Sequence, residues 1–221
     1  MKRFACVAAV CLVATLGVGA VSAQAQTASP GPDPKKYVEI NVGPTLGHKS
    51  DKFVGGEAGL RVAEGLYVII EASHMGNVAT TDLDDRATII ANYLGGSATT
   101  AFKVSHLAAG LRYNIDLNVL PMVQPYVLGA VGIAHVKTEV AFSVNGTVID
   151  PASQVQLGSD LSGTLNKAMI VVGFGVNVPF ATRFFADLGY RYGRILAKTG
   201  NFETDTSIPT QRVVLGVGVR F

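Results

Sequence analysis

The chain has 221 residues, of which 48% are hydrophobic and only 15% charged, and its formal net charge is +2. This length suits a single domain, and the nearly balanced charge excludes the concentrated basic surface that nucleic-acid binding requires. Beyond the first 25 residues, no apolar run reaches the roughly 18 residues of a membrane-spanning helix. If the protein is inserted in a membrane, it must therefore be a closed β-barrel, because strands satisfy their backbone hydrogen bonds in lipid only when the sheet closes.

The N-terminus carries the parts of a secretory signal peptide. Two basic residues are followed by an almost wholly apolar stretch and then by small residues, which is the order of such peptides. We expect residues 1–23 to be this peptide, with cleavage after Ala23 or Ala25; an uncleaved membrane anchor is the alternative. Cleavage would remove Cys6, Cys11 and two of the 18 basic residues, leaving 16 basic against 16 acidic ones. The mature chain would then hold no disulfide, no thiol nucleophile and no cysteine-ligated metal.

The rest of the chain reads as a flexible lead followed by strands. Residues 24–36 are rich in proline, glutamine and serine and predict a periplasmic lead, and residues 37–221 predict the barrel. We predict eight strands, most of them about 11 residues long, the length of a tilted transmembrane strand. They are Tyr37–Gly47, Phe53–Ala63, Leu66–Gly76, Lys103–Ile115, Gln124–Lys137, Lys167–Pro179, Arg183–Arg194 and Thr210–Phe221. A short helical turn is expected within Asp84–Tyr93.

The charges decide which face of each strand points inward. Side chains alternate between the two faces of a strand, and an Arg or Lys facing the bilayer midplane costs roughly 2–4 kcal/mol. We therefore expect the apolar stripes to face lipid and the charges to face the barrel axis. The expected inward charges are Glu57, Arg61, Glu71, Arg112, Asp187, Arg191, Arg212 and Arg220. The strand at 124–137 is apolar on both faces, so its orientation stays open.

The connections alternate in length. Those at one end are short or moderate, whereas three at the other end are long and polar, at 76–102, 138–166 and 195–209. Short periplasmic turns opposite long outer loops are typical of outer-membrane barrels. Within 138–166, Asn145-Gly146 lies between apolar runs, a pairing that predicts a β-hairpin. We expect this hairpin to stand above the membrane.

Aromatic residues occupy the ends of several strands. Phe180, Phe184 and Phe221 are expected near the periplasmic interface, and Tyr190 and Tyr192 toward the outer one. Two such girdles are expected of a membrane barrel.

The last strand has an apolar side chain at every second position and ends on an aromatic ring. Val217, Val219 and Phe221 complete this pattern, which resembles the assembly signal of bacterial outer-membrane β-barrels. Together with the signal peptide and the strand pattern, it makes the chain resemble the small eight-stranded outer-membrane barrel superfamily, the group that contains OmpX and the transmembrane domain of OmpA. The resemblance covers everything after the predicted signal peptide.

This resemblance implies an all-β fold, an eight-stranded antiparallel up-and-down transmembrane barrel in the outer membrane of a Gram-negative-type bacterium. It implies contact with outer-membrane lipid and lipopolysaccharide, recognition of the last strand by the barrel-assembly machinery, and a monomer without a cofactor. The implied role is non-enzymatic: membrane integrity, and presentation of the long loops to host or phage surface ligands.

The inward charges must pair with one another. An eight-stranded barrel is only just wide enough to be filled by side chains, and isolated charge in such an interior is prohibitive. We expect a packed, salt-bridged plug. The alternative is a narrow gated pore, in which partner exchange among Glu57, Arg61 and Arg112 opens a path for water.

Two further alternatives remain. The first is a lipid A or phospholipid-modifying enzyme, because His48 and Ser50 have a His-x-Ser spacing and Ser73-His74 lies near the same end; nucleophilic catalysis would also need a third, orienting group. The second is a soluble lipocalin-like barrel, which would place apolar residues inside and charges outside.

No metal site is expected. His106 and His135 fall on separate strands without ligand spacing and read as interior polar residues. The acidic run Asp82–Asp85 lacks the glycine and distal glutamate of a calcium loop, so we interpret it as a solvated loop.

Overall fold

The computed structural model describes residues 35–116, 123–149, 163–196 and 207–221. The predicted signal peptide, most of the predicted lead and the middle parts of three predicted connections lie outside the described residues. The described elements are β1 (Lys36–Leu46), β2 (Lys52–Ala63), β3 (Leu66–Met75), α2 (Thr81–Tyr93), β4 (Ser97–Asn114), β5 (Gln124–Val144), β6 (Thr147–Ile149), β7 (Gly163–Pro179), β8 (Phe184–Ile195) and β9 (Ile208–Arg220).

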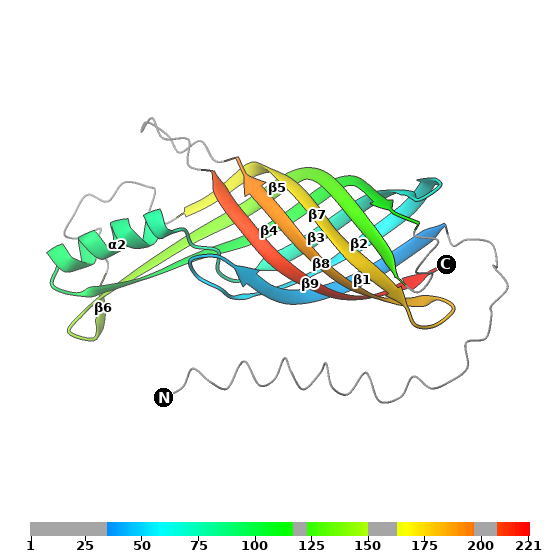
Figure 1. Cartoon of the computed structure of the whole chain (residues 1–221). Helices are drawn as coiled ribbons and strands as arrows, with labels where there is room; N and C mark the ends of the chain where they lie inside the picture. The colour runs from blue at the N-terminus through cyan, green and yellow to red at the C-terminus, as the bar shows by residue number, and fades with distance from the viewer. Residues whose placement is uncertain (1–34, 117–122, 150–162, 197–206) are drawn as a thin grey trace, which may run out of the picture. The chain divides into compact units, whose positions relative to one another are not determined.

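Eight of the strands close into one antiparallel barrel (Figure 1). Strands pair in chain order from β1 to β5 and from β7 to β9, while β5 pairs with β7 and β1 pairs with β9. Backbone hydrogen bonds complete this closing pair: the Lys36 amide donates to the Phe221 carbonyl at 3.0 Å, and the Phe221 amide donates to the Lys36 carbonyl at 2.9 Å. Among the described strands, β6 pairs with β5 alone. The predicted eight-stranded antiparallel barrel is confirmed.

Apolar side chains cover the outside of the barrel, and charged side chains fill its inside. Ile40 is 69% exposed and Phe174 is 60% exposed, whereas Arg112 is completely buried. A soluble protein has the opposite distribution, because unpaired charge is costly away from water. The soluble lipocalin-like alternative is therefore wrong.

The structure also orients β5, which is apolar on both faces. Leu128 lies opposite Arg112 of β4, and Ile133 lies opposite Leu107. Directly paired residues of neighbouring strands point to the same face, so the inward Arg112 carries Leu128 inward, and Ile133 points outward with Leu107. The burial agrees: Leu128 is 6% exposed and Ile133 is 63% exposed. The orientation of β5 is thus set by its neighbours, not by its own composition.

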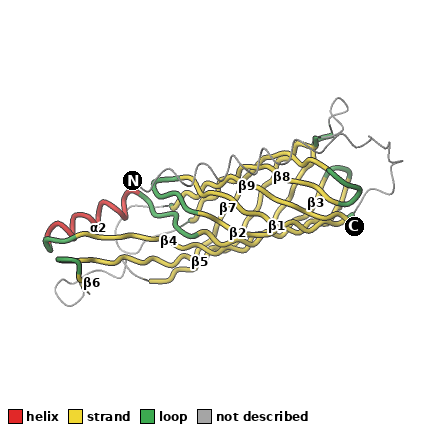
Figure 2. The backbone as a smooth tube through the Cα atoms, turned by 90° about the horizontal axis from the view of Figure 1, so that it is seen from below, coloured by secondary structure: helices red, strands yellow, loops and turns green. Residues whose placement is uncertain are grey.

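Three strands extend farther than predicted. The structure starts β4 six residues before Lys103, ends β5 seven residues after Lys137 and starts β7 four residues before Lys167. The pairing of β3 with β4 ends at Met75 and Val104, but β4 and β5 stay paired as far as Ser97 and Ser143. Figure 2 shows this extension at the end of the barrel that carries α2 and β6. Polar residues such as Thr99 interrupt the alternation of apolar residues in this part of the sequence, so the alternation did not predict the extension. Threonine is nevertheless well suited to strands.

The helix α2 is about three and a half turns long instead of the predicted short turn. It covers 13 residues, from Thr81 to Tyr93, and buries Leu83, Ala87 and Ala91. These residues are four apart and form one face of a helix. This face packs against β4 and β5. In the part of the chain that the structure describes, no helix is long and apolar enough to cross a membrane.

The predicted hairpin is present at the tip of the extension. Asn145 and Gly146 connect β5 to β6, and both have a positive φ, 52° and 79°. This is the backbone of a two-residue type I′ turn, whose twist matches that of the strands it joins. Val144 of β5 accordingly lies opposite Thr147 of β6.

Candidate functional site

The barrel interior holds two like-charged pairs that face each other. Glu57 of β2 lies directly opposite Glu71 of β3, and Arg191 of β8 lies directly opposite Arg212 of β9. Each pair alone would be destabilising, because like charges opposite one another repel. All four side chains point into the lumen, so the carboxylates of one wall neutralise the guanidinium groups of the other.

The ion pairs form a chain across the lumen. Arg191 Nη2 lies 3.3 Å from Glu57 Oε2, and Arg191 Nε lies 3.4 Å from Glu71 Oε2. Arg112 Nη1 of β4 donates to Glu57 Oε1 at 2.8 Å, and Arg212 Nη2 donates to Glu71 Oε1. The order is therefore Arg112, Glu57, Arg191, Glu71, Arg212. All five side chains are at most 4% exposed.

Aromatic rings fill the space around this chain. The Arg112 guanidinium lies 3.5 Å from the centroid of the Tyr126 ring. The Tyr37 hydroxyl donates to Glu57, and the Tyr37 ring packs edge-on against Tyr67 and Phe185. Cation–π contacts of this kind are strongest where water is absent. The interior of the barrel is thus packed with side chains at this level.

Glu39 belongs to the interior and was missed by the sequence reasoning. It is 1% exposed on β1, and its Oε2 lies 3.7 Å from Arg112 Nη1. The alternation of Tyr37, Glu39 and Asn41 with the apolar Val38, Ile40 and Val42 could have revealed it. Together with Asp187, it brings the buried carboxylates of the described chain to four, and the same residues include three buried arginines.

Glu39 and Asp187 are less well paired than Glu57 and Glu71. The Tyr126 hydroxyl donates to Asp187 Oδ2 at 2.8 Å, while Arg191 Nη2 remains 3.9 Å away. Within the described residues, Glu39 Oε2 and Asp187 Oδ1 are buried without a hydrogen-bond partner. Both side chains lie beside Gly216 of β9. A Cβ added at Gly216 would lie 2.3 Å from Glu39 Oε1 and 3.2 Å from Asp187 Cβ.

The two remaining predicted inward charges lie toward the periplasmic end. Arg220 Nη2 donates to Gln124 Oε1 at 2.8 Å, and its guanidinium lies over the Phe185 ring. Arg61 lies opposite Tyr67 near the turn between β2 and β3, and it is partly exposed. Val217 and Phe221 of the predicted assembly signal point outward and are 58% and 59% exposed.

The two candidate interior histidines lie on opposite faces of the barrel wall. His106 is buried, with Nε2 2.8 Å from Glu71 Oε1 and Nδ1 3.1 Å from Ser73 Oγ. His135 is exposed on the outer face, where Nδ1 contacts Asn166 Oδ1 at 2.8 Å. The interior placement of His135 is therefore wrong, because the register set by β4 turns its odd-numbered position outward.

The outer end of the barrel is crossed by a polar contact between the first loop and α2. Lys49 Nζ donates to Asp84 Oδ1 at 2.5 Å and to Thr100 Oγ1 at 2.8 Å, and His48 Nε2 lies 3.1 Å from Asp84 Oδ2. Hydrogen bonds from Lys49, Thr100 and His48 hold the pKa of Asp84 well below its usual range. Asp84 thus lies on a helix and is engaged in contacts, which corrects its interpretation as part of a solvated acidic loop.

The proposed catalytic pairs are not assembled by these contacts. Ser73 is buried in the interior and His74 is exposed on the outer face, so they lie on opposite sides of the wall. His48 does have a carboxylate partner in Asp84, but Ser50 makes no side-chain hydrogen bond among the residues that the structure describes. In the same part of the chain, no cluster of three or more histidine, cysteine, aspartate or glutamate side chains could hold a metal ion.

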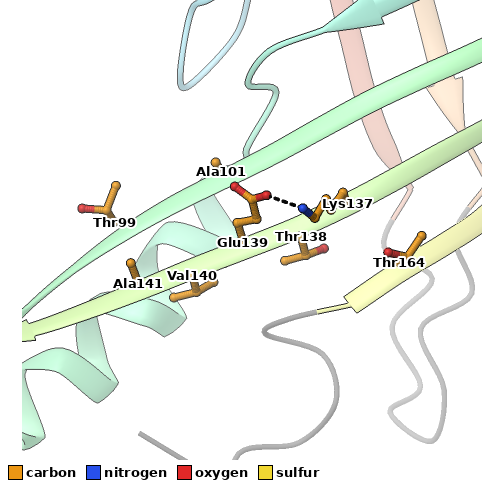
Figure 3. A pocket seen from close by; sticks show the side chains of 8 residues that line it. All are labelled: Thr99, Ala101, Lys137, Thr138, Glu139, Val140, Ala141 and Thr164. Atoms are coloured by element: carbon orange, nitrogen blue, oxygen red, sulfur yellow. Dashed lines mark ion pairs between the residues drawn. The ribbon is translucent and has the colours of Figure 1, made fainter. Parts of the chain in front are cut away.

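A third polar cluster lies on the outer wall of β4 and β5, above the apolar stripes. Lys103 lies directly opposite Lys137, and both ammonium groups contact Glu139, at 2.7 Å and 2.9 Å. The cluster borders an open pocket of about 530 Å³. Figure 3 shows Lys137 turned toward Glu139 on the side of β5 that faces this pocket.

Comparison with known proteins extends these observations. The family model for the outer membrane protein beta-barrel domain matches residues 11–221. A search of curated proteins found no match. Among solved structures, neisserial surface protein A (NspA) is similar, with 17% identity, a TM-score of 0.52 and coverage of 85% of this chain and 97% of that chain.

Two further structures align over similar lengths. Ail of Yersinia pestis has 18% identity and a TM-score of 0.48 and covers 86% of this chain and 99% of its own. The N-terminal barrel domain of Pseudomonas aeruginosa OprF has 18% identity and a TM-score of 0.46 and covers 86% and 100%. Because the family model spans nearly the whole sequence, the chain belongs to the outer membrane protein beta-barrel domain family, and its place is the bacterial outer membrane.

Proposed function

We propose that this protein is a non-enzymatic surface protein, in which a closed barrel anchors a rigid binding platform on the outside of the cell. The platform consists of the extension of β4 and β5 beyond the barrel, the small strand β6 and the helix α2. The observation that carries the proposal is the continuous pairing of β4 with β5 as far as Ser97 and Ser143, well beyond the last β3–β4 pair.

The platform is held in one conformation by internal contacts. The Val78 amide donates to the Phe102 carbonyl at 2.9 Å, and the Gly96 amide donates to the Ala91 carbonyl at 2.8 Å. The first bond ties the segment before α2 to β4, and the second caps the end of α2 in the turn that leads into β4. A surface that is ordered before binding loses little conformational entropy when a partner binds.

The platform exposes large apolar residues on α2 and on β6. Ile89 is 68% exposed and Tyr93 is 85% exposed on α2, and Val148 is 74% exposed on β6. Ile89 and Tyr93 are four residues apart and therefore share one helix face. Aromatic side chains are enriched among the residues that dominate binding energy at protein interfaces.

The alternatives find less support. A pore requires a water-filled path, whereas the lumen of the described barrel carries a chain of arginine–carboxylate pairs with stacked aromatic rings. An enzyme requires a nucleophile within hydrogen-bond reach of its base. His48 has an acidic partner, but its contacts hold the first loop on α2, and we assign them a structural role.

The proposal is tested by adhesion. Bacteria that produce the intact chain should bind a monolayer of cultured epithelial cells, and the Ile89→Ser/Tyr93→Ser variant should lose most of this binding. The control variant is Leu107→Ala, which changes an exposed apolar residue of the lipid-facing wall, outside the platform. Correct insertion is checked by the mobility shift of the heated and unheated protein in gel electrophoresis. Equal adhesion of the platform variant and the intact chain would refute the proposal.

A further inference from the structure

We propose that the outer wall of β4 and β5 binds the phosphate group of a lipid A-type glycolipid from the surrounding outer leaflet, between Lys103 and Lys137. This site lies at the base of the binding platform, on the outward face of β4 and β5. Its occupant is a membrane lipid instead of a partner on another surface.

The two lysines lie at the outer edge of the lipid-facing wall. Tyr113 lies on β4 at the end of the short turns, opposite Leu66, and points outward with 49% exposure. Lys103 is ten positions farther along the same face. At about 3.4 Å per residue and a tilt of about 40°, ten residues rise about 26 Å, close to the apolar band of about 25 Å in such barrels. Lys103 and Lys137 therefore lie where hydrocarbon gives way to the headgroups of the outer leaflet.

Apolar residues line the outward face between the level of Tyr113 and that of Lys103. Leu107 and Leu111 are 59% and 51% exposed on β4, and Val131 and Ile133 are 65% and 63% exposed on β5. They form an apolar wall against which acyl chains can pack, and the polar pair Ser105 and His135 lies between this wall and the lysines. The ligand of the lysines is therefore expected to be amphiphilic, with its anionic group above its hydrocarbon chains.

The charges of Lys103, Lys137 and Glu139 do not balance. Two ammonium groups directly opposite one another repel, and Glu139 compensates for only one of them. Hydrogen bonds from Lys103 and Lys137 lower the pKa of Glu139 to about 2, so this carboxylate is ionised at neutral pH. The cluster thus keeps one surplus positive charge. Each ammonium has three donors, of which the carboxylate engages one.

An open pocket lies beside the cluster. The open pocket of about 530 Å³ is lined by Thr99, Ala101, Lys137, Glu139, Ala141 and Thr164, among others. Figure 3 shows the hydroxyl-bearing Thr99 and Thr164 on either side of the Lys137–Glu139 pair. Just below, the exposed His135 contacts Asn166, and His74 contacts Ser105. A phosphate in this position would find ammonium, hydroxyl and imidazole donors around it.

The test uses the full chain after insertion, purified in detergent, with binding measured by native mass spectrometry. The lipid probes are bisphosphorylated lipid A and the same lipid after removal of both phosphates, and inorganic phosphate is the soluble competitor. The Lys103→Gln/Lys137→Gln variant should bind the phosphorylated lipid at least about tenfold more weakly, as the loss of charge-assisted hydrogen bonds predicts. Lys52→Gln, an exposed lysine at the start of β2 near the same rim, should bind like the intact chain.

A second variant separates binding from a structural role. Glu139→Gln removes the carboxylate that competes with the phosphate, so it should bind phosphorylated lipid A more tightly than the intact chain. If the cluster only stabilised the strands, Glu139→Gln would bind no more tightly. The proposal is overturned if the double lysine variant binds phosphorylated lipid A as well as the intact chain, or if inorganic phosphate displaces the lipid at equal concentration. It is also overturned if the dephosphorylated lipid binds equally well.

Discussion

At the scale of single residues, the interior carboxylates contribute differently to the stability of the barrel, although all of them are buried. Glu57 accepts hydrogen bonds from Tyr37 and Arg112 and lies near Arg191. Glu39 Oε2 has no hydrogen-bond partner among the described residues, and its nearest guanidinium nitrogen is 3.7 Å away. Among the described residues, the interior buries four carboxylates and three arginines, and Glu39 and Asp187 have the longest of the interior ion-pair distances, 3.7 Å and 3.9 Å.

Two isosteric substitutions should separate these roles. Glu57→Gln leaves the Arg112 and Arg191 guanidinium groups without their shared counter-charge, and we expect it to lower the free energy of unfolding by about 3–5 kcal/mol. Glu39→Gln removes a poorly paired charge and should change the same quantity by less than about 1 kcal/mol. Urea unfolding of the barrel in phospholipid vesicles measures both. An equal loss in the two variants would contradict this account of the interior.

At the scale of elements, α2 is attached to the barrel by packing and by one carboxylate. Asp84 contacts His48 and Lys49 of the first loop and Thr100 of β4, so two segments distant in the sequence converge on it. The helix and the first loop therefore form one unit over the outer end of the barrel. Their attachment should respond to pH through Asp84.

The direction of this response follows from the lowered pKa of Asp84. A carboxyl whose pKa is lower in the folded protein stabilises it fully above the unfolded value of about 3.9, and this stabilisation declines as the pH falls below that value. Hydrogen exchange of the α2 amides should therefore be unchanged between neutral pH and about pH 5, after correction for intrinsic exchange rates, and should accelerate below about pH 4. Asp84→Asn should abolish the acid step; an unchanged acid step in this variant would show that another group controls it.

The elements were predictable from the sequence to different degrees. The membrane strands were found because outward apolar and inward charged residues alternate, and the hairpin because Asn145-Gly146 is specific for its turn. Strand β5 lacked any polar marker, so only the pairing of Leu128 with Arg112 could orient it. The length of α2 was missed because its buried face consists mostly of alanine. Small alanine side chains do not give the sequence a clear stripe of large apolar residues at helical spacing. Contacts such as that of Lys49 with Asp84 join residues far apart in the chain, and no local pattern announces them.

At the scale of the whole molecule, the barrel is expected to be closed to ions. The chain from Arg112 to Arg212 crosses the lumen, and its members are almost completely buried. Opening it would require separating several ion pairs in a low-dielectric interior. We predict that the purified protein gives no current in planar bilayers at any applied voltage. Steps of conductance that disappear in Glu57→Gln or Arg191→Gln would instead support the gated pore.

The closing pair of β1 with β9 has a consequence for biogenesis. The two partners are the first and last strands of the barrel, so no shorter portion of the polypeptide can complete the ring. Until β9 has been exported, every intermediate exposes two sheet edges with unsatisfied amide and carbonyl groups, which neither lipid nor a neighbouring chain can safely cover. The unfinished chain must therefore be kept apart from its copies in the periplasm, and insertion is bound to follow export instead of accompanying it.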